Sequence, residues 1–164
     1  MPNASVVLRT ATETDVPTIL ELIEALADYE RLRDQCVATE ERLRATLFGA
    51  VPMAEVVLAE ADGQVAGFAL FCGNYSTFLA KPGIWLEDLF VRPEFRGDGI
   101  GKRLLAHLAQ LAIERDCGRV EWAVLDWNTP SIGFYESIGA RGATEWTTFR
   151  LTGDAITALA ASVT

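Results

Sequence analysis

One segment of the sequence constrains the fold more than any other, because it joins an apolar strand to an amphipathic helix through a glycine-rich turn. We expect the strand at residues 84–91, and a proline two residues later blocks its continuation. We expect the helix to run from the turn to about Asp116, with apolar residues at helical spacing. Glycines at positions 97, 99 and 101 let the backbone curl around an anion, which a helix N-terminus favours. The segment therefore predicts a phosphate-binding turn.

The remaining periodicities place this turn inside a mixed α/β domain without internal repeats. Asp62-Gly63 between two apolar runs is typical of a β-hairpin turn. Residues 73–83 are the longest irregular stretch, which we expect to be a loop on the substrate side. Strands are expected at residues 6–8, 55–60, 65–71, 84–91, 120–125 and 144–151, and helices at residues 13–29, after Thr39, and at residues 100–116, 128–138 and 154–161.

The composition suits one soluble domain and disfavours several classes of protein. Half of the 164 residues are hydrophobic, which is enough for a core without disulfide or metal staples. The net charge of −9, from 14 basic and 23 acidic side chains, disfavours sequence-independent binding to nucleic acid. The sequence has no apolar run near the roughly 18 residues of a membrane span, and its start does not resemble a secretory signal. We therefore expect a cytoplasmic protein with neither nucleic-acid nor membrane partners.

Cysteine and histidine are too sparse for metal or nucleophilic chemistry. Cys36, Cys72 and Cys117 are widely spaced and form no Cys-x-x-Cys pair, which fits reduced thiols. His107, the single histidine, has no Cys, Asp or Glu nearby at ligand spacing, so we expect a structural or surface residue and no metal site. Chemistry in this chain must therefore use carboxylates, tyrosine and the backbone.

Three phosphate-binding patterns compete for the glycine-rich turn, and a plain helix-capping turn is the fourth possibility. A dinucleotide fold requires Gly-x-Gly-x-x-Gly after the first strand of a larger sheet, whereas this motif comes late and is spaced Gly-x-Gly-x-Gly. A nucleoside triphosphate loop requires a hydroxyl after Gly-Lys, and Gly101-Lys102-Arg103 lacks it. The third pattern, Arg-x-x-Gly-x-Gly, is present as Arg96, Gly99 and Gly101.

The stretch Arg96-Gly97-Asp98-Gly99-Ile100-Gly101 resembles the central motif of the GNAT superfamily of N-acetyltransferases. Leu86-Glu87-Asp88-Leu89-Phe90-Val91 before it and the stretch from Trp127 to Tyr135 after it resemble the diamine branch, which includes spermidine/spermine and thialysine acetyltransferases. The early stretch from Ile19 to Glu30 resembles that branch too. The resemblance spans nearly the whole chain. It implies one GNAT domain over residues 5–164, with a mixed, mostly antiparallel sheet flanked by helices.

The resemblance implies that acetyl-CoA is the acetyl donor and that no metal takes part. Backbone groups of Leu89 and Val91 would bind the pantetheine arm as an added strand would, and the Leu89 amide would support the oxyanion. The turn would hold the pyrophosphate. The residues expected to contact the donor are Leu89, Phe90, Val91, Arg96, Gly97, Asp98, Gly99, Ile100, Gly101, Lys102 and Asn128.

Glu87 and Asp88 are adjacent acids inside an apolar strand. A regular strand would point them to opposite faces, and a buried carboxylate is costly unless it is used or paired. An alkylammonium with a pKa near ~10.4 must lose a proton before its nitrogen attacks. The resemblance implies that Glu87 binds the amine and passes its proton to water, and that Asp88 binds the amine or has a structural role. A salt bridge to a neighbouring arginine is the structural alternative for this pair.

Further residues are assigned to the site by the same resemblance. Tyr29 and Glu30 match a Tyr-Glu pair of the family, and Trp85 would hold a cation against its ring, with core packing as the alternative. Tyr135 would protonate the departing thiolate, and aromatic packing with Phe134 is the alternative. The acceptor-binding set is therefore Tyr29, Glu30, Trp85, Glu87 and Asp88, and the catalytic pair is Glu87 and Tyr135.

These assignments predict direct acetyl transfer from acetyl-CoA to a primary amine of a small cationic acceptor, a polyamine or a lysine-like amine. No covalent acetyl-enzyme is expected, because no cysteine has an activating partner. Acetylation of a protein N-terminus or an antibiotic-like amine, and a non-catalytic acyl-CoA sensor, are the alternatives. The resemblance also implies a homodimer. The acidic first helix would attract the cation, while the basic residues from Arg92 to Arg103 would hold the anionic donor.

Overall fold

A five-stranded sheet in the order β1-β2-β3-β4-β5 organises the chain. The computed structural model describes residues 5–163. The strands are β1 (Val6–Thr10), β2 (Glu55–Ala61), β3 (Gln64–Ser76), β4 (Lys81–Val91) and β5 (Val120–Trp122). Neighbouring strands are antiparallel except for β4 and β5, which are parallel. The expected mixed, mostly antiparallel sheet is therefore confirmed.

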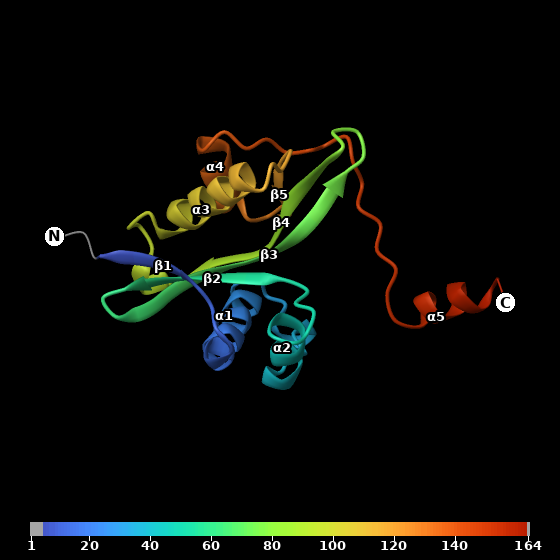
Figure 1. Cartoon of the computed structure of the whole chain (residues 1–164), viewed down its shortest axis with the longest axis horizontal. Coiled ribbons are helices and arrows are strands. Elements are labelled where there is room, and N and C mark those ends of the chain that lie inside the picture. Colours follow the sequence, from blue (N-terminus) through green and yellow to red (C-terminus); the bar gives the residue numbers. More distant parts are fainter. Residues whose placement is uncertain (1–4, 164) are drawn as a thin grey trace. The chain divides into compact units, whose positions relative to one another are not determined.

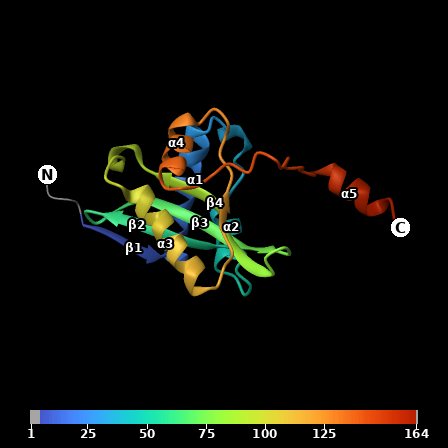
Figure 2. The same ribbon diagram turned by 90° about the horizontal axis from the view of Figure 1, so that it is seen from above.

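Five α-helices lie within residues 5–163. They are α1 (Val16–Tyr29), α2 (Glu40–Leu47), α3 (Ile100–Glu114), α4 (Thr129–Ser137) and α5 (Asp154–Ala161), and short 3-10 turns span Glu13–Asp15, Arg33–Gln35 and Pro93–Phe95. Helices α1 and α2 lie on one face, and α3 lies on the opposite face (Figures 1 and 2). Among the described residues 5–163, no helix is both long and apolar enough to span a membrane.

The chain divides into two compact units, one ending at Leu125 and the other beginning at Asp126. The first unit holds the sheet with α1, α2 and α3, and the second holds α4 and α5.

The core of the first unit forms because each helix turns its apolar stripe to the sheet. On the α1 face, Ile19 and Leu22 are fully buried in a cluster with Phe68 of β3 and Phe90 of β4. On the α3 face, the apolar residues whose spacing predicts the helix are the ones that are buried. They are Ile100, Leu104, Leu105, Leu108 and Ala112. Strand β4 is therefore covered on both faces.

The expected loop at residues 73–83 is wrong. Strand β3 continues to Ser76 and β4 begins at Lys81, so only residues 77–80 turn between them. Tyr75 pairs with Pro82 across this long hairpin. Glycine and proline in the stretch suggested a loop, but cross-strand pairing outweighs their low strand propensity.

The expected strand at residues 144–151 is also wrong, since none of these residues is in a strand. Its β-prone residues are not buried, and the side chains of Trp146 and Phe149 are 74% and 93% exposed. A strand exists only when its backbone has a partner, which local propensity cannot supply. The terminal helix after it is confirmed as α5.

An arginine joins the start of α1 to the edge of the sheet. The Arg9 guanidinium of β1 donates two hydrogen bonds to the Asp15 carboxylate, at 2.7 and 2.9 Å, and its Nε donates to Glu60 of β2 at 2.6 Å. The Thr12 N–H also donates to Asp15, as in a capping box. These hydrogen bonds, with that from Arg9 the strongest, lower the pKa of Asp15 to about 2.

We expect Asp15→Asn to destabilise the protein in a pH-dependent way. Because folding lowers the pKa of Asp15 from 3.8 to about 2, its stabilisation is present above pH 4 and is lost as the pH falls toward 2. Urea unfolding should show a free energy lower by about 2 kcal/mol at pH 7, and a much smaller difference at pH 2.5. The exposed Asp34→Asn is the control, with a change within about 0.5 kcal/mol. An equal loss for Asp15→Asn at both pH values would contradict this account.

Candidate active site

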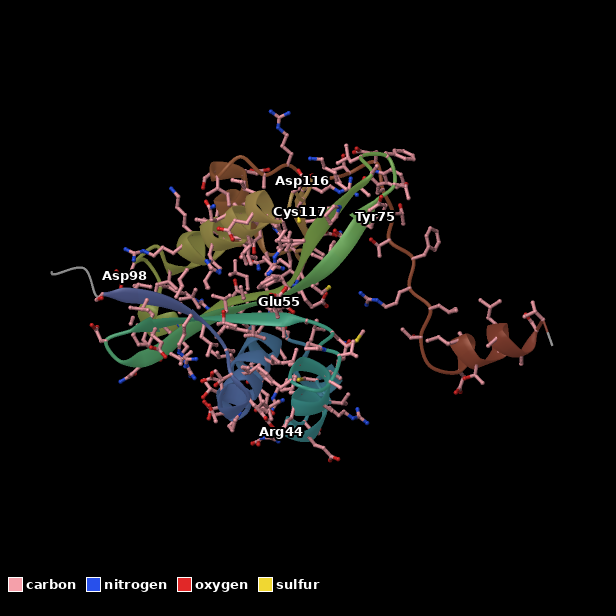
Figure 3. All side chains as sticks on the ribbon, viewed as in Figure 1. Arg44, Glu55, Tyr75, Asp98, Asp116 and Cys117 are labelled. Carbon is pink, nitrogen blue, oxygen red and sulfur yellow. The ribbon has the colours of Figure 1, made fainter. Side chains whose placement is uncertain are left out.

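The glycine-rich turn leads into α3 with the backbone geometry of an anion site. Gly97 and Gly99 have φ of +93° and +76°, which side chains with a Cβ rarely adopt, and a Cβ at either position would meet nothing within 4 Å. The turn is therefore shaped by backbone conformation, and the space outside it is open. Among the described residues, no side chain caps the N-terminus of α3, and its first turn has no acid. Asp98 of this turn is exposed (Figure 3). The turn can therefore hold a phosphate.

Strand β4 has an edge that β5 pairs only in part. Pairing between β4 and β5 ends at Leu86. Beyond it, the Arg92 N–H donates to the Ala66 carbonyl of β3, so Leu89 and Val91 point their backbone groups away from β3. Because β5 does not pair with this part of β4, an extended amide chain can bind along the edge.

Arg96 joins this edge to the end of α1. Its Nε donates to the Val91 carbonyl at 2.9 Å. Its guanidinium lies over the rings of Tyr29 and Phe90, at 5.1 and 5.5 Å from their centroids. The side chain therefore packs on aromatic rings as well as contributing charge, and it ties the glycine-rich turn to the helix that ends beside Glu30.

A β-bulge in the middle of β4 changes the direction of its side chains. Leu86 pairs with Phe71 and Asp88 pairs with Leu70, so Glu87 has no partner residue on β3. The strand is therefore not regular at these two acids, so the alternation of a regular strand does not apply to them. Glu87 is exposed, whereas Asp88 is half-buried. Bulges re-aim side chains in this way, often beside active sites.

Three carboxylates gather around the bulge. Burial raises the pKa of Asp88 to about 6, with further increases from the charges of Glu87 and Glu30. Burial also raises the pKa of Glu30, which directly follows α1 at the end where the helix dipole adds negative potential. Within residues 5–163, none of the three forms an ion pair with Lys or Arg, so the salt-bridge alternative is wrong. The structure thus brings together three of the residues expected to bind the acceptor. Their arrangement favours a cation.

Trp85 and Cys72 lie beside these carboxylates. The indole N–H of Trp85 donates to Oε2 of Glu87 at 2.7 Å. Cys72 pairs with Trp85 across β3 and β4, and burial together with the Glu87 charge raises the pKa of its thiol. Sequence reasoning missed Cys72 as a neighbour of the site, and only the hairpin pairing reveals it.

The second unit holds the other two expected site residues on or before α4. Asn128 is 6% exposed, and its Oδ1 accepts a hydrogen bond from the Ser131 N–H, so it caps α4. Tyr135 lies on the same helix, with its ring 5.4 Å from that of Phe134. The helix is confirmed, and the roles of Asn128 and Tyr135 stay predictions.

The part of the chain that the structure describes contains no group of three or more His, Cys, Asp or Glu residues arranged to hold a metal. His107 is half-buried on α3.

Comparisons with known proteins agree on one family. The model of the acetyltransferase (GNAT) family matches residues 20–140. A thialysine N-epsilon-acetyltransferase from Sus scrofa is 40% identical over 168 residues, covering 96% of this chain and 98% of that protein. An L-ornithine N5-acetyltransferase from Arabidopsis thaliana is 38% identical over 197 residues, covering 93% and 86%.

Solved structures show the same fold. An integron cassette protein from the mobile metagenome of V. cholerae has a TM-score of 0.81 and 28% identity, covering 95% of this chain and 98% of that one. An aminoglycoside acetyltransferase from an uncultured soil metagenomic sample has a TM-score of 0.75 at 20% identity, covering 90% and 95%. The second likeness concerns the fold alone.

We expect Asp88→Asn to stabilise the protein at neutral pH. Because folding raises the pKa of Asp88 from 3.8 to about 6, ionising it above pH 6 costs stability, and this cost is absent below pH 4. Chemical denaturation should give a free energy of unfolding higher by about 2 kcal/mol at pH 7.5 and nearly unchanged at pH 4. Asp62→Asn, in the exposed turn between β2 and β3, is the control and should change neither value by more than about 0.5 kcal/mol. Destabilisation by Asp88→Asn at pH 7.5 would contradict the electrostatic account.

Proposed function

Because the chain belongs to the acetyltransferase (GNAT) family and is an N-acetyltransferase, we propose that it moves an acetyl group from acetyl-CoA directly to a primary amine of a small cationic acceptor. One observation carries the choice of acceptor: Glu30, Glu87 and Asp88 gather at the β4 bulge, and within residues 5–163 they have no Lys or Arg partner. Such a group of carboxylates is stabilised by a bound ammonium.

The glycine-rich turn and the open edge of β4 suit acetyl-CoA, which supplies the acetyl thioester. The N-terminus of α3 would hold the diphosphate, and the backbone of Leu89 and Val91 would bind the pantetheine amides. Lys102, exposed in the first turn of α3, would add positive charge. Asn128 would bind the same arm, as the resemblance implies.

The acceptor amine would bind at the carboxylates beside this edge. Glu87 is exposed and would take the amine's proton, directly or through water, so that the nitrogen can attack the acetyl carbon. Asp88 and Glu30 would hold a second positive charge, which a polyamine or a lysine-like amine carries. The named substrates of the two relatives, thialysine and ornithine, are also amines of this kind.

When the thioester bond breaks, Tyr135 would supply the proton that the departing thiolate takes up. The C–S bond electrons go to the sulfur of CoA, and the phenol proton neutralises the thiolate as it leaves. The proton that the acylated nitrogen releases would then restore the phenol. Cys72 is a poor nucleophile, because burial and the Glu87 charge raise the pKa of its thiol and disfavour the thiolate. This supports direct transfer without an acetyl-enzyme.

The location and assembly of the protein are part of the same proposal. The resemblance implies a homodimer, and the three widely spaced cysteines suit a reducing compartment such as the cytoplasm. The net charge of −9 supports a cationic small molecule rather than nucleic acid as the partner.

An amine panel tests the proposed function. Purified protein is given acetyl-CoA with spermidine, putrescine, thialysine, ornithine, lysine, an aminoglycoside or a short peptide, and CoA release is followed. We expect turnover with at least one small cationic amine, with kcat/KM roughly tenfold or more above that for the peptide and the aminoglycoside. Turnover confined to the peptide or the aminoglycoside would overturn the acceptor class. Binding of acetyl-CoA without turnover of any amine would overturn the proposed reaction.

We expect Tyr135→Phe to lower kcat about 100-fold, because it removes the proton donor for the thiolate. The affinity for acetyl-CoA, measured by calorimetry, should change less than about twofold, since the ring remains. Tyr75→Phe is the matched control, because Tyr75 lies 63% exposed at the end of β3. An unchanged kcat for Tyr135→Phe would exclude Tyr135 as the acid.

A further inference from the structure

The hydrogen bond between Trp85 and Glu87 joins two side chains on the same strand, two residues apart. The donor–acceptor distance of 2.7 Å, from Nε1 to Oε2, is that of a hydrogen bond to a charged acceptor. Within residues 5–163, the structure gives Glu87 no ion pair that would orient it instead. The bond engages one carboxylate oxygen and leaves the other for a ligand.

The two residues differ in how firmly the sheet holds their backbones. Trp85 pairs with Cys72 of β3 on one side and with Glu121 of β5 on the other. Glu87 lies just beyond the last pair with β5 and in the bulge opposite β3, so it has no partner residue on either side. The indole therefore extends from a part of β4 that is paired on both sides to Glu87, whose backbone is paired on neither side.

The chemistry of the donor suits a carboxylate that must keep its charge. The charges of Glu87 and Glu30 both act on Asp88. Because like charges repel, this repulsion would drive the Glu87 carboxylate toward solvent. An arginine or lysine could hold Glu87 in place, but it would also neutralise the charge that attracts an ammonium. An indole N–H is uncharged and only donates, so it orients the carboxylate and leaves its charge available.

We propose that Trp85 is a positioning residue that orients Glu87 for proton transfer from the acceptor amine. This inference rests on the proposed function, which makes Glu87 the proton acceptor. It gives Trp85 a role that depends on its N–H group, in place of the ring–cation contact or core packing that its sequence suggested.

Kinetics of four variants test the proposal: Trp85→Phe, Trp85→Leu, Glu87→Ala and the double variant Trp85→Phe/Glu87→Ala. The phenyl ring retains the aromatic face and loses the N–H. We expect Trp85→Phe to lower kcat roughly tenfold or more, as loss of one hydrogen bond to a charged group does, while KM for the amine changes less than about twofold. Trp85→Leu should lower kcat at least as much. In the Glu87→Ala background, Trp85→Phe should cause no further loss, because nothing is left to position.

Nuclear magnetic resonance tests the hydrogen bond without relying on activity. The indole N–H signal of Trp85 is assigned by its disappearance in Trp85→Phe. We expect Glu87→Ala to move this signal upfield, as loss of a carboxylate acceptor does. The signal of Trp146, whose side chain is 74% exposed, is the internal control and should stay in place.

The outcomes separate this inference from the proposed function. If Glu87→Ala lowers kcat but Trp85→Phe does not, or if the two losses multiply fully in the double variant, the positioning role is overturned while the reaction stands. If Trp85→Phe is silent and Trp85→Leu alone raises KM, Trp85 acts through its ring and the proposal is wrong. If Glu87→Ala leaves kcat intact, the proton-transfer step of the proposed function fails, and the positioning role fails with it.

Discussion

The interruption of pairing on both sides of β4 is the constraint on which the rest of the candidate site depends. On the β3 side, the bulge leaves Glu87 without a partner and pairs Asp88 with Leu70, where the Asp88 carboxyl group interacts with the charge of Glu30. On the β5 side, pairing stops at Leu86 and leaves the edge at Leu89 and Val91 open. A fully paired, regular strand would have hidden this edge and separated the two acids. The same few residues therefore create a place for an extended amide chain and a place for a cation.

This part of the first unit has two regions that favour ligands of opposite charge. The N-terminus of α3, with its glycines and exposed Lys102, favours an anion. The bulge, with Glu87 and Asp88 beside Glu30 at the C-terminus of α1, favours a cation. Keeping three carboxylates together costs folding energy, most of all at the half-buried Asp88. Arg96 connects the two regions. Its guanidinium lies over the ring of Tyr29, the residue before Glu30, and its Nε donates a hydrogen bond to the Val91 carbonyl.

Much of the fold could be predicted from local patterns, and the errors share one cause. The helices α1, α3 and α5 end within a few residues of their expected limits, because apolar spacing, caps and glycines are local signals. The expected loop at 73–83 and the expected strand at 144–151 are wrong in opposite directions. In both segments the outcome depended on a partner strand. Tyr75 pairs with Pro82 of β4, whereas the exposed residues around Phe149 pair with no strand among residues 5–163. Strand propensity alone carries no information about partners.

The sequence by itself determined the glycine-rich turn before α3, the family, and the residue types from which the site is built, because these depend on motifs and on spacing along one chain. Only the tertiary structure decided how Glu30, Glu87 and Asp88 meet, that Trp85 donates to Glu87, and that Arg96 packs on Tyr29. These contacts depend on the bulge and on the docking of α1 against β4. A one-residue change in register reverses which face a side chain occupies, and a linear pattern does not record that register.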